Sequence, residues 1–248
     1  MALISGVGAK KFSPPHGSTY ACVRKAGETI KQRKKMMEMS GKEGKEAAKK
    51  DDVKQMVKEK YASISGSRDS CGTCCGGGEG LGAFMESGRR LSYSEADCLR
   101  AMEAGATTLG CGNPVAEADI KAGEMVVDLG CGPGFDVFLS AEKTGKTGRV
   151  VGIDMTPEMI ERAKANARRL GVENVKFRLG EIENPPLDDG EADVVMSNCV
   201  INLSADKGAV YREMFRILKP GGRISISDTL RSGDMPGAIM DDPGAWTG

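Results

Sequence analysis

A chain of 248 residues, 40% of them hydrophobic, is long enough for one large domain or for one domain and part of a second. Its 35 Lys and Arg residues balance 35 Asp and Glu residues, and a formal net charge of zero argues against a protein dedicated to nucleic acid or to a membrane surface. No apolar run approaches the roughly 20 residues that cross a bilayer, so we expect neither a membrane nor a nucleic-acid partner.

The eight cysteines are expected to remain thiols. The opening stretch MALISGVGAKKF is too short and too rich in glycine for a secretory signal, which favours a cytoplasmic protein. An organelle transit peptide is the weaker alternative, because residues 1–27 contain no acid. In a reducing compartment, cysteines serve chemistry or soft-metal binding more often than disulfide frameworks. We expect the protein to be a monomer.

Basic residues gather at the N-terminal end, where the first 60 residues carry 15 Lys or Arg against 7 Asp or Glu. The pair Pro14-Pro15, scattered glycines and lysine-rich runs predict a flexible tail there. We therefore expect four regions: a flexible basic tail over 1–50, a helical and cysteine-loop region over 51–122, an α/β domain over 123–230, and the start of a further region over 231–248.

Two helices are predicted ahead of the α/β domain. Apolar residues at helical spacing predict one helix over about residues 51–61. The stretch 65–82 is rich in Gly, Ser and Cys, and predicts a loop. Ser94 followed by Asp97 resembles a weak capping box, which predicts a second helix that runs to about residue 104.

From residue 125 onward, β-branched segments alternate with segments of helical character. Strands are predicted over 125–130, 149–155, 175–181, 192–202 and 223–229, and helices over 135–145, 156–170 and 205–218. Thr156-Pro157 reads as an N-cap followed by a proline at the first helical position. The alternation predicts an α/β fold, a Rossmann-like doubly wound sheet with parallel strands covered on both faces.

A glycine-rich turn, Asp128-Leu129-Gly130-Cys131-Gly132-Pro133-Gly134, follows the first of these strands. Glycines there let a ligand approach the main chain at the carboxyl end of the strand, where open α/β sheets bind ligands. Asp154 ends the second strand, at a spacing suited to holding ribose hydroxyls. The plainer reading is a tight strand–helix connection without a ligand.

The strings DLGCGPG, GIDM and LKPGG resemble successive motifs of the class I S-adenosylmethionine-dependent methyltransferases. The resemblance implies that S-adenosylmethionine is the cofactor, that Asp128 lies near its amino group and that Asp154 holds its ribose. It also implies that Glu181 and Ile182 flank the adenine. The cofactor-binding residues expected on this basis are Asp128, Gly130, Cys131, Gly132, Gly134, Asp154, Met155, Glu181, Ile182 and Asn198.

Three groups of cysteines bear on the substrate. Cys199 ends the fourth strand, at the edge of this fold that faces the transferred methyl group, although a small buried side chain is an equal reading. Cys111 lies between two glycines ahead of an Asn-Pro turn, where it has little to pack against. The run Cys71-Gly72-Thr73-Cys74-Cys75 could bind zinc, but it lacks a second pair, and the only histidine, His16, lies in the tail.

The Cys-Cys loop, LGCGNP, DLGCGPGFD, GIDMTPEM, GEIE and SNCVINL together resemble the arsenite methyltransferase family. The resemblance implies that Cys111 and Cys199 hold trivalent arsenic as thiolates, since thiolates select soft ions. It implies that Cys74 or Cys75 takes part in a redox cycle with thioredoxin or glutathione as reductant, and that arsenite–thiol adducts are the substrate in arsenic detoxification. Arsenic held in this way would attack the cofactor methyl in line, without a general base.

In that family a further cysteine follows a segment like residues 242–248, where this chain ends. We therefore expect a C-terminally truncated chain, with residues 231–248 as the start of the substrate region and residues 123–230 as the S-adenosylmethionine-binding domain. Two alternatives stay open. One is a methyltransferase for a small organic acceptor, and the other is a metalloid-binding protein without catalysis.

Overall fold

The computed structural model describes residues 20–25, 46–66, 81–103 and 110–230. Cys71, Cys74 and Cys75, and the region predicted over 231–248, lie outside the described residues. Within them, no helix is both long and apolar enough to cross a membrane.

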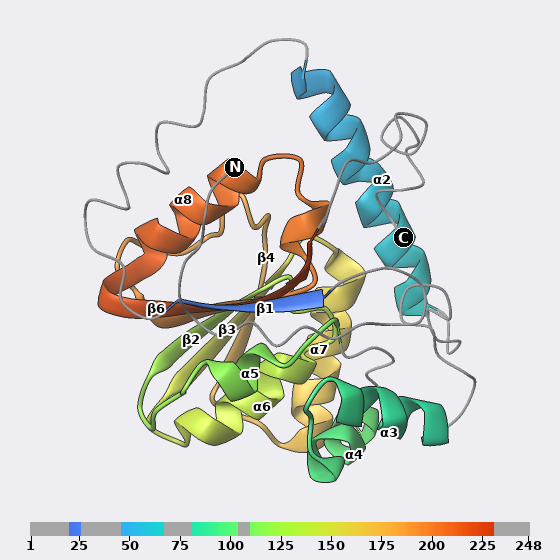
Figure 1. The fold of residues 1–248 in the computed structure, drawn as a ribbon, viewed down its shortest axis with the longest axis vertical. Coiled ribbons are helices and arrows are strands. Elements are labelled where there is room, and N and C mark those ends of the chain that lie inside the picture. Colours follow the sequence, from blue (N-terminus) through green and yellow to red (C-terminus); the bar gives the residue numbers. More distant parts are fainter. Residues whose placement is uncertain (1–19, 26–45, 67–80, 104–109, 231–248) are drawn as a thin grey trace.

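A six-stranded sheet forms the centre of the molecule, in the order β1-β6-β5-β2-β3-β4 (Figure 1). The five strands from β2 to β6 run parallel, and β1 pairs with β6 in the antiparallel sense. The strands are β1 (Tyr20–Lys25), β2 (Met125–Leu129), β3 (Arg149–Asp154), β4 (Val175–Leu179), β5 (Ala192–Asn198) and β6 (Leu218–Thr229).

Helices lie on both sides of this sheet, with α5 and α6 on one side and α8 on the other (Figure 1). The helices are α2 (Glu46–Gly66), α3 (Leu81–Arg90), α4 (Glu95–Glu103), α5 (Pro114–Glu117), α6 (Phe135–Thr144), α7 (Pro157–Leu170) and α8 (Lys207–Ile217), with a 3-10 turn, η1 (Ile201–Leu203), after β5. This arrangement confirms the predicted Rossmann-like α/β fold.

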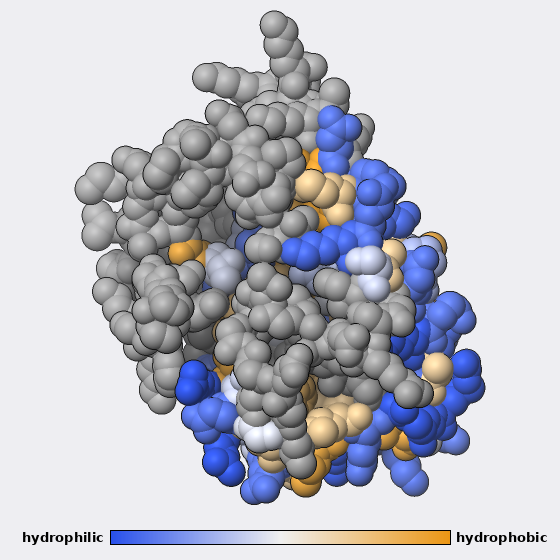
Figure 2. All heavy atoms as spheres, turned by 90° about the vertical axis from the view of Figure 1, so that its right-hand side faces the viewer, coloured by the Kyte–Doolittle hydropathy of each residue, from blue (hydrophilic) through white to orange (hydrophobic). Residues whose placement is uncertain are grey.

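Packing on both faces of the sheet explains why the central strands are rich in apolar residues. Val126 packs with α6 residues on one face of the sheet, whereas its neighbour Val127 packs with Met214 and Ile217 of α8 on the other. Because successive side chains of a strand point to opposite faces, both must be apolar when helices cover both faces. On the side of the molecule shown in Figure 2, the described surface is mainly hydrophilic, with only small hydrophobic patches.

The helix starts predicted at Ser94 and at Thr156-Pro157 are confirmed, the second with a different capping interaction. Ser94 Oγ accepts a hydrogen bond from Asp97 N at 3.1 Å, and Asp97 accepts one from Ser94 N at 3.0 Å, which is a complete capping box. Thr156 precedes α7 but makes no side-chain cap bond. Its backbone N–H donates to Asp154 instead, at 2.9 Å, so this threonine supports the preceding carboxylate.

Several elements depart from the sequence prediction. Helices α3 and α5 were not predicted, α2 begins at Glu46 within the predicted tail, and the strand predicted over 192–202 ends at Asn198, so that Cys199 follows it. Strand β1 lies within residues 1–50, where only a flexible tail was predicted, because the free edge of β6 supplies backbone partners that no local pattern reveals. Strand β6 begins at Leu218, so Lys219-Pro220-Gly221-Gly222 belongs to a strand instead of ending a helix, and the pairing shifts register opposite Ala192 and Val194.

Candidate active site

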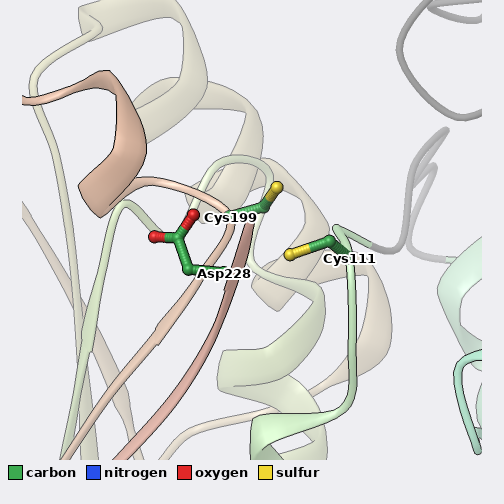
Figure 3. Close-up of side chains that lie close together, drawn as sticks. All are labelled: Cys111, Cys199 and Asp228. Atoms are coloured by element: carbon green, nitrogen blue, oxygen red, sulfur yellow. The ribbon is translucent and has the colours of Figure 1, made fainter. Parts of the chain in front are cut away.

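Two thiols and a carboxylate gather at the carboxyl edge of the sheet (Figure 3). The Sγ atoms of Cys111 and Cys199 and a carboxylate oxygen of Asp228 all lie within 4.8 Å of one another. Both cysteines are half-buried, and Asp228 is buried. The structure thus brings together the two cysteines that the sequence singled out, and it adds an acid that the sequence analysis missed.

Cys199 is held in a strained backbone conformation directly after β5. Its φ is +60°, a left-handed value that costs a non-glycine residue roughly 1–2 kcal/mol. The backbone N–H of Cys199 donates to the carbonyl of Ser227 at 2.7 Å, which ties it to β6. The side-chain amide of Asn202 lies 3.9 Å from Cys199 Sγ and donates to Asp228 Oδ1 at 2.7 Å.

Cys111 reaches the same edge because glycines flank it. A β-carbon on Gly110, where φ is +67°, would lie 2.3 Å from Asn198 Oδ1, and one on Gly112 would lie 2.6 Å from Ser227 Oγ. Only glycine therefore allows this loop to lie against the ends of β5 and β6. The backbone N–H of Cys111 donates to Asn198 Oδ1 at 3.0 Å, so the residue that precedes Cys199 also fixes Cys111.

Asn198 is the centre of a hydrogen-bond network. Its amide nitrogen lies 2.9 Å from both the Gly112 carbonyl and Asp136 Oδ2, and 3.2 Å from Tyr93 Oη. The Tyr93 hydroxyl in turn lies 2.8 Å from Asp136 Oδ1. Burial, followed by the charge of Asp136, raises the pKa of Tyr93 well above its usual value, which keeps the phenol protonated as a donor. The amide predicted to bind the cofactor is therefore engaged with the Cys111 loop.

The glycine-rich turn adjoins the cysteine loop. A β-carbon on Gly130 would lie 2.5 Å from Val200 Cγ1, whereas one on Gly132 would meet nothing within 4 Å. Gly130 thus permits close packing against the residue after Cys199, and Gly132 leaves open space beside the turn. Gly134, with φ +97°, begins α6. Cys131 is buried in the core under Gly152, and burial raises the pKa of its thiol well above the usual value.

Three carboxyl groups surround this turn, those of Asp128 and Asp136, which are buried, and that of Asp154, which is half-buried. Burial raises the pKa of Asp128 well above its usual value, and the charges of Asp136 and Asp154 raise it further. Burial also raises the pKa of Asp136 to about 6, against the opposing hydrogen bonds from Asn198 and Tyr93. Burial likewise raises the pKa of Asp154, although hydrogen bonds from Thr156 and Gly132 oppose this shift. Three carboxyl groups thus lie together beside the turn, and this arrangement favours a positively charged ligand.

The remaining predicted cofactor residues lie along the same edge. Asp154 Oδ2 accepts a bond from Gly132 N at 3.0 Å, and Met155 follows it, half-exposed. Ile182 is buried beyond the end of β4. Glu181 is half-exposed and pairs with Lys54 of α2 at 2.7 Å. Helix α2, which also packs on α7, thereby contacts the loop predicted to flank adenine.

Asp228 could have been found from its position. Strands β5 and β6 are parallel neighbours, with Asn198 opposite Ser227. The next residue along each chain segment, Cys199 and Asp228, must therefore meet at the same edge of the sheet. The sequence signal is a single acid near the end of the segment SISDT, and no motif marked it.

Residues 120–247 match the sequence profile of a family described as "Methyltransferase domain". The chain is 41% identical to an arsenite methyltransferase of Halobacterium salinarum over 210 residues, which are 80% of this chain and 52% of that protein. It is 47% identical to an arsenite methyltransferase of Aquipseudomonas alcaligenes over 147 residues, 56% of this chain and 42% of that protein. The chain thus spans about half the length of the curated relatives it matches.

Among solved structures, the fold resembles an arsenic(III) S-adenosylmethionine methyltransferase from Chlamydomonas reinhardtii, with a TM-score of 0.52 and 40% sequence identity. The likeness covers 57% of this chain and 50% of that one. The family profile, the parallel sheet and the glycine-rich turn at its carboxyl edge agree with one another, and the chain belongs to the methyltransferase domain family, with the Rossmann-like fold of the S-adenosylmethionine-dependent class I enzymes.

Proposed function

We propose that this protein transfers the methyl group of S-adenosylmethionine to thiolate-bound trivalent arsenic. The single observation that carries the proposal is the convergence of Cys111 and Cys199 at the carboxyl edge of the sheet, next to the glycine-rich turn. Thiolates are the donors that soft, thiophilic ions prefer. The named relatives, arsenite methyltransferases of two microorganisms, support the same substrate.

The three carboxyl groups beside the glycine-rich turn fit the proposed cofactor. S-adenosylmethionine carries a positively charged sulfonium and an ammonium group, and it supplies an electrophilic methyl group when bound. Asp128 would bind the ammonium group and Asp154 the ribose hydroxyls, with Gly132 leaving room at the turn. Met155, Glu181 and Ile182 would surround the adenine. A cationic ligand here offsets the cost of burying carboxylates.

The cysteines would hold the substrate in place. Arsenite, delivered as a thiol adduct, exchanges onto Cys111 and Cys199, and the thiol protons leave with the displaced thiols. Trivalent arsenic bears a lone pair and no proton, so the site needs no general base for methyl transfer. The contribution of the protein is to fix the position of the arsenic relative to the cofactor, which is the entropic advantage of an oriented pair. Asn198 serves this purpose by anchoring the Cys111 loop.

Methylation formally oxidises arsenic, and the electrons must be restored. We assign Cys74 or Cys75 as one of two cysteine thiols that supply these two electrons by forming a disulfide, which thioredoxin or glutathione then reduces by thiol–disulfide exchange. In cells, this activity would convert arsenite to methylated arsenicals for detoxification.

The test is methyl transfer from labelled S-adenosylmethionine to arsenite with excess thiol, with separation of the arsenic species. The unchanged protein should yield methylated arsenic, and Cys111→Ser and Cys199→Ser should each lose nearly all of it. Cys98→Ala is the matched control, because Cys98 is buried in α4 outside the cluster. Undiminished product from Cys199→Ser would overturn the role of Cys199. Cofactor binding without any arsenic product would point to another acceptor.

A further inference from the structure

We propose that Cys111, Cys199 and Asp228 form a binding site for a divalent thiophilic cation of the zinc and cadmium class, with two sulfur donors and one oxygen donor. This inference is separate from the proposed methylation. It rests on the carboxylate, which thiolate-bound arsenic does not need and which divalent zinc accepts as an oxygen ligand.

The spacing of the three donor atoms suits such an ion. In a tetrahedral zinc site, with bonds of about 2.3 Å to sulfur and about 2.0–2.2 Å to oxygen, neighbouring ligand atoms lie about 3.5–3.8 Å apart. The two Sγ atoms and the carboxylate oxygen of Asp228 lie within 4.8 Å of one another. Small side-chain rotations would close the difference, and the fourth coordination position would stay open to water or an external thiol.

The three donors are also tied to one another by hydrogen bonds. Cys111 N donates to Asn198, the residue before Cys199, and Cys199 N donates to the carbonyl of Ser227, the residue before Asp228. Asn202 donates from its backbone to Asp228 Oδ2 at 3.1 Å and from its side chain to Oδ1 at 2.7 Å. Such outer partners orient metal ligands, and here they are in place before any ion binds.

The charge and the burial of Asp228 also favour a cation site. Asp228 is 9% exposed, and it accepts hydrogen bonds from Asn202 and from the backbone of Thr229. A carboxylate offers about four lone-pair positions, so these three bonds leave one for an ion. Binding would proceed as the cation displaces one proton from each thiol, and two protons would pass to the solvent for each ion bound.

The test uses cadmium ions alone, titrated into the full chain with Cys22, Cys71, Cys74 and Cys75 replaced by serine. These four are removed because they would offer sulfur donors elsewhere, and the two cysteines that remain outside the cluster, Cys98 and Cys131, are buried. Circular dichroism establishes that this background is folded. Thiolate-to-cadmium charge-transfer absorption and calorimetry in two buffers then give the stoichiometry, the affinity and the protons released.

We expect one cadmium ion per chain and two protons released. Adding Cys111→Ser or Cys199→Ser should weaken binding by more than tenfold, and so should Asp228→Asn, since loss of even an outer-sphere partner costs ten- to a hundredfold. The matched control, Asp52→Asn, changes an exposed acid of α2 and should bind cadmium normally. Failure of the background to bind cadmium would overturn the site.

The cadmium chemical shift separates ligation by Asp228 from mere support of the loop. In the background protein it should report a mixed sulfur and oxygen environment, and it should move in Asp228→Asn. An unchanged shift and affinity in that variant would overturn the role of Asp228. If the variant does not fold, a shift typical of sulfur donors alone in the background protein would overturn it. Because the metal is the only probe, neither result depends on arsenic methylation.

Discussion

Val200 fills the space beside Gly130 so closely that a β-carbon on Gly130 would lie 2.5 Å from both of its γ-carbons. Val200 follows Cys199 directly, and Gly130 belongs to the turn that we assign to the cofactor. This contact therefore fixes the thiol-bearing loop against the glycine-rich turn.

We predict that Gly130→Ala destabilises the fold by about 2–5 kcal/mol, because the new methyl group meets Val200 and the residue must keep a φ of +76°. Gly132→Ala should cost only about 1–2 kcal/mol, since its β-carbon would meet open space and only the positive φ is strained. Thermal and denaturant unfolding measure both. Equal losses in the two variants would show that the Val200 contact does not matter.

Asp136 should make stability depend on pH. Its pKa rises from the ordinary 3.8 to about 6 in the folded protein, so the folded state holds its proton more tightly than the unfolded state. The contribution is fully present below about pH 4 and is lost as pH rises through about 6, a loss of about 3 kcal/mol. Asp136→Asn should flatten this part of the profile. Urea unfolding across this pH range checks it, and an unchanged profile in the variant would contradict the assignment.

Asn198→Ala should loosen the Cys111 loop. Loss of its part-buried hydrogen bonds should cost about 1–3 kcal/mol. In the background with Cys22, Cys71, Cys74 and Cys75 replaced by serine, it should also weaken the binding of a bifunctional arsenical, such as phenylarsine oxide, by roughly tenfold. Asn174→Ala is the matched control. Asn174 also donates to backbone carbonyls, those of Ala141 and Gly145, and so should lose stability without losing arsenical affinity. Equal effects on affinity would indicate general destabilisation.

Cys199→Gly should stabilise the folded chain by about 1 kcal/mol. In the background with Cys22, Cys71, Cys74 and Cys75 replaced by serine, it should also abolish arsenical binding. The gain arises because glycine adopts the observed φ of +60° without strain. Cys199→Ser should lose binding without this gain. Chemical denaturation of the two variants makes the comparison, and a Gly variant less stable than the Ser variant would contradict it.

The parallel sheet could be predicted from the sequence, because strands that are buried on both faces are rich in apolar residues. Strands such as β2 and β3 contain runs of apolar residues and are followed by glycine or end in aspartate, and the helix α7 between β3 and β4 begins with the cap signal Thr156-Pro157. β1 was not predicted, because its partner is an open strand edge about 200 residues away in the chain.

The site was predictable only in part. Cys111 and Cys199 stood out by residue type and by the glycines and strand end beside them. Asp228 and the anchoring role of Asn198 depend on which strands are neighbours and on which side chains face each other, and neither is encoded locally. Tyr93 likewise enters the network from a segment that no motif marked.

The hydrogen bond between Cys111 and Asn198 joins positions 87 residues apart in the chain. Two thiols so distant cannot be held together until the strands between them have assembled, because closing so long a loop in a disordered chain is entropically costly. A small molecule that bridges both sulfurs therefore binds the native chain selectively and raises its stability by mass action. Bridging of Cys111 and Cys199 can thus serve as a chemical reporter of completed folding.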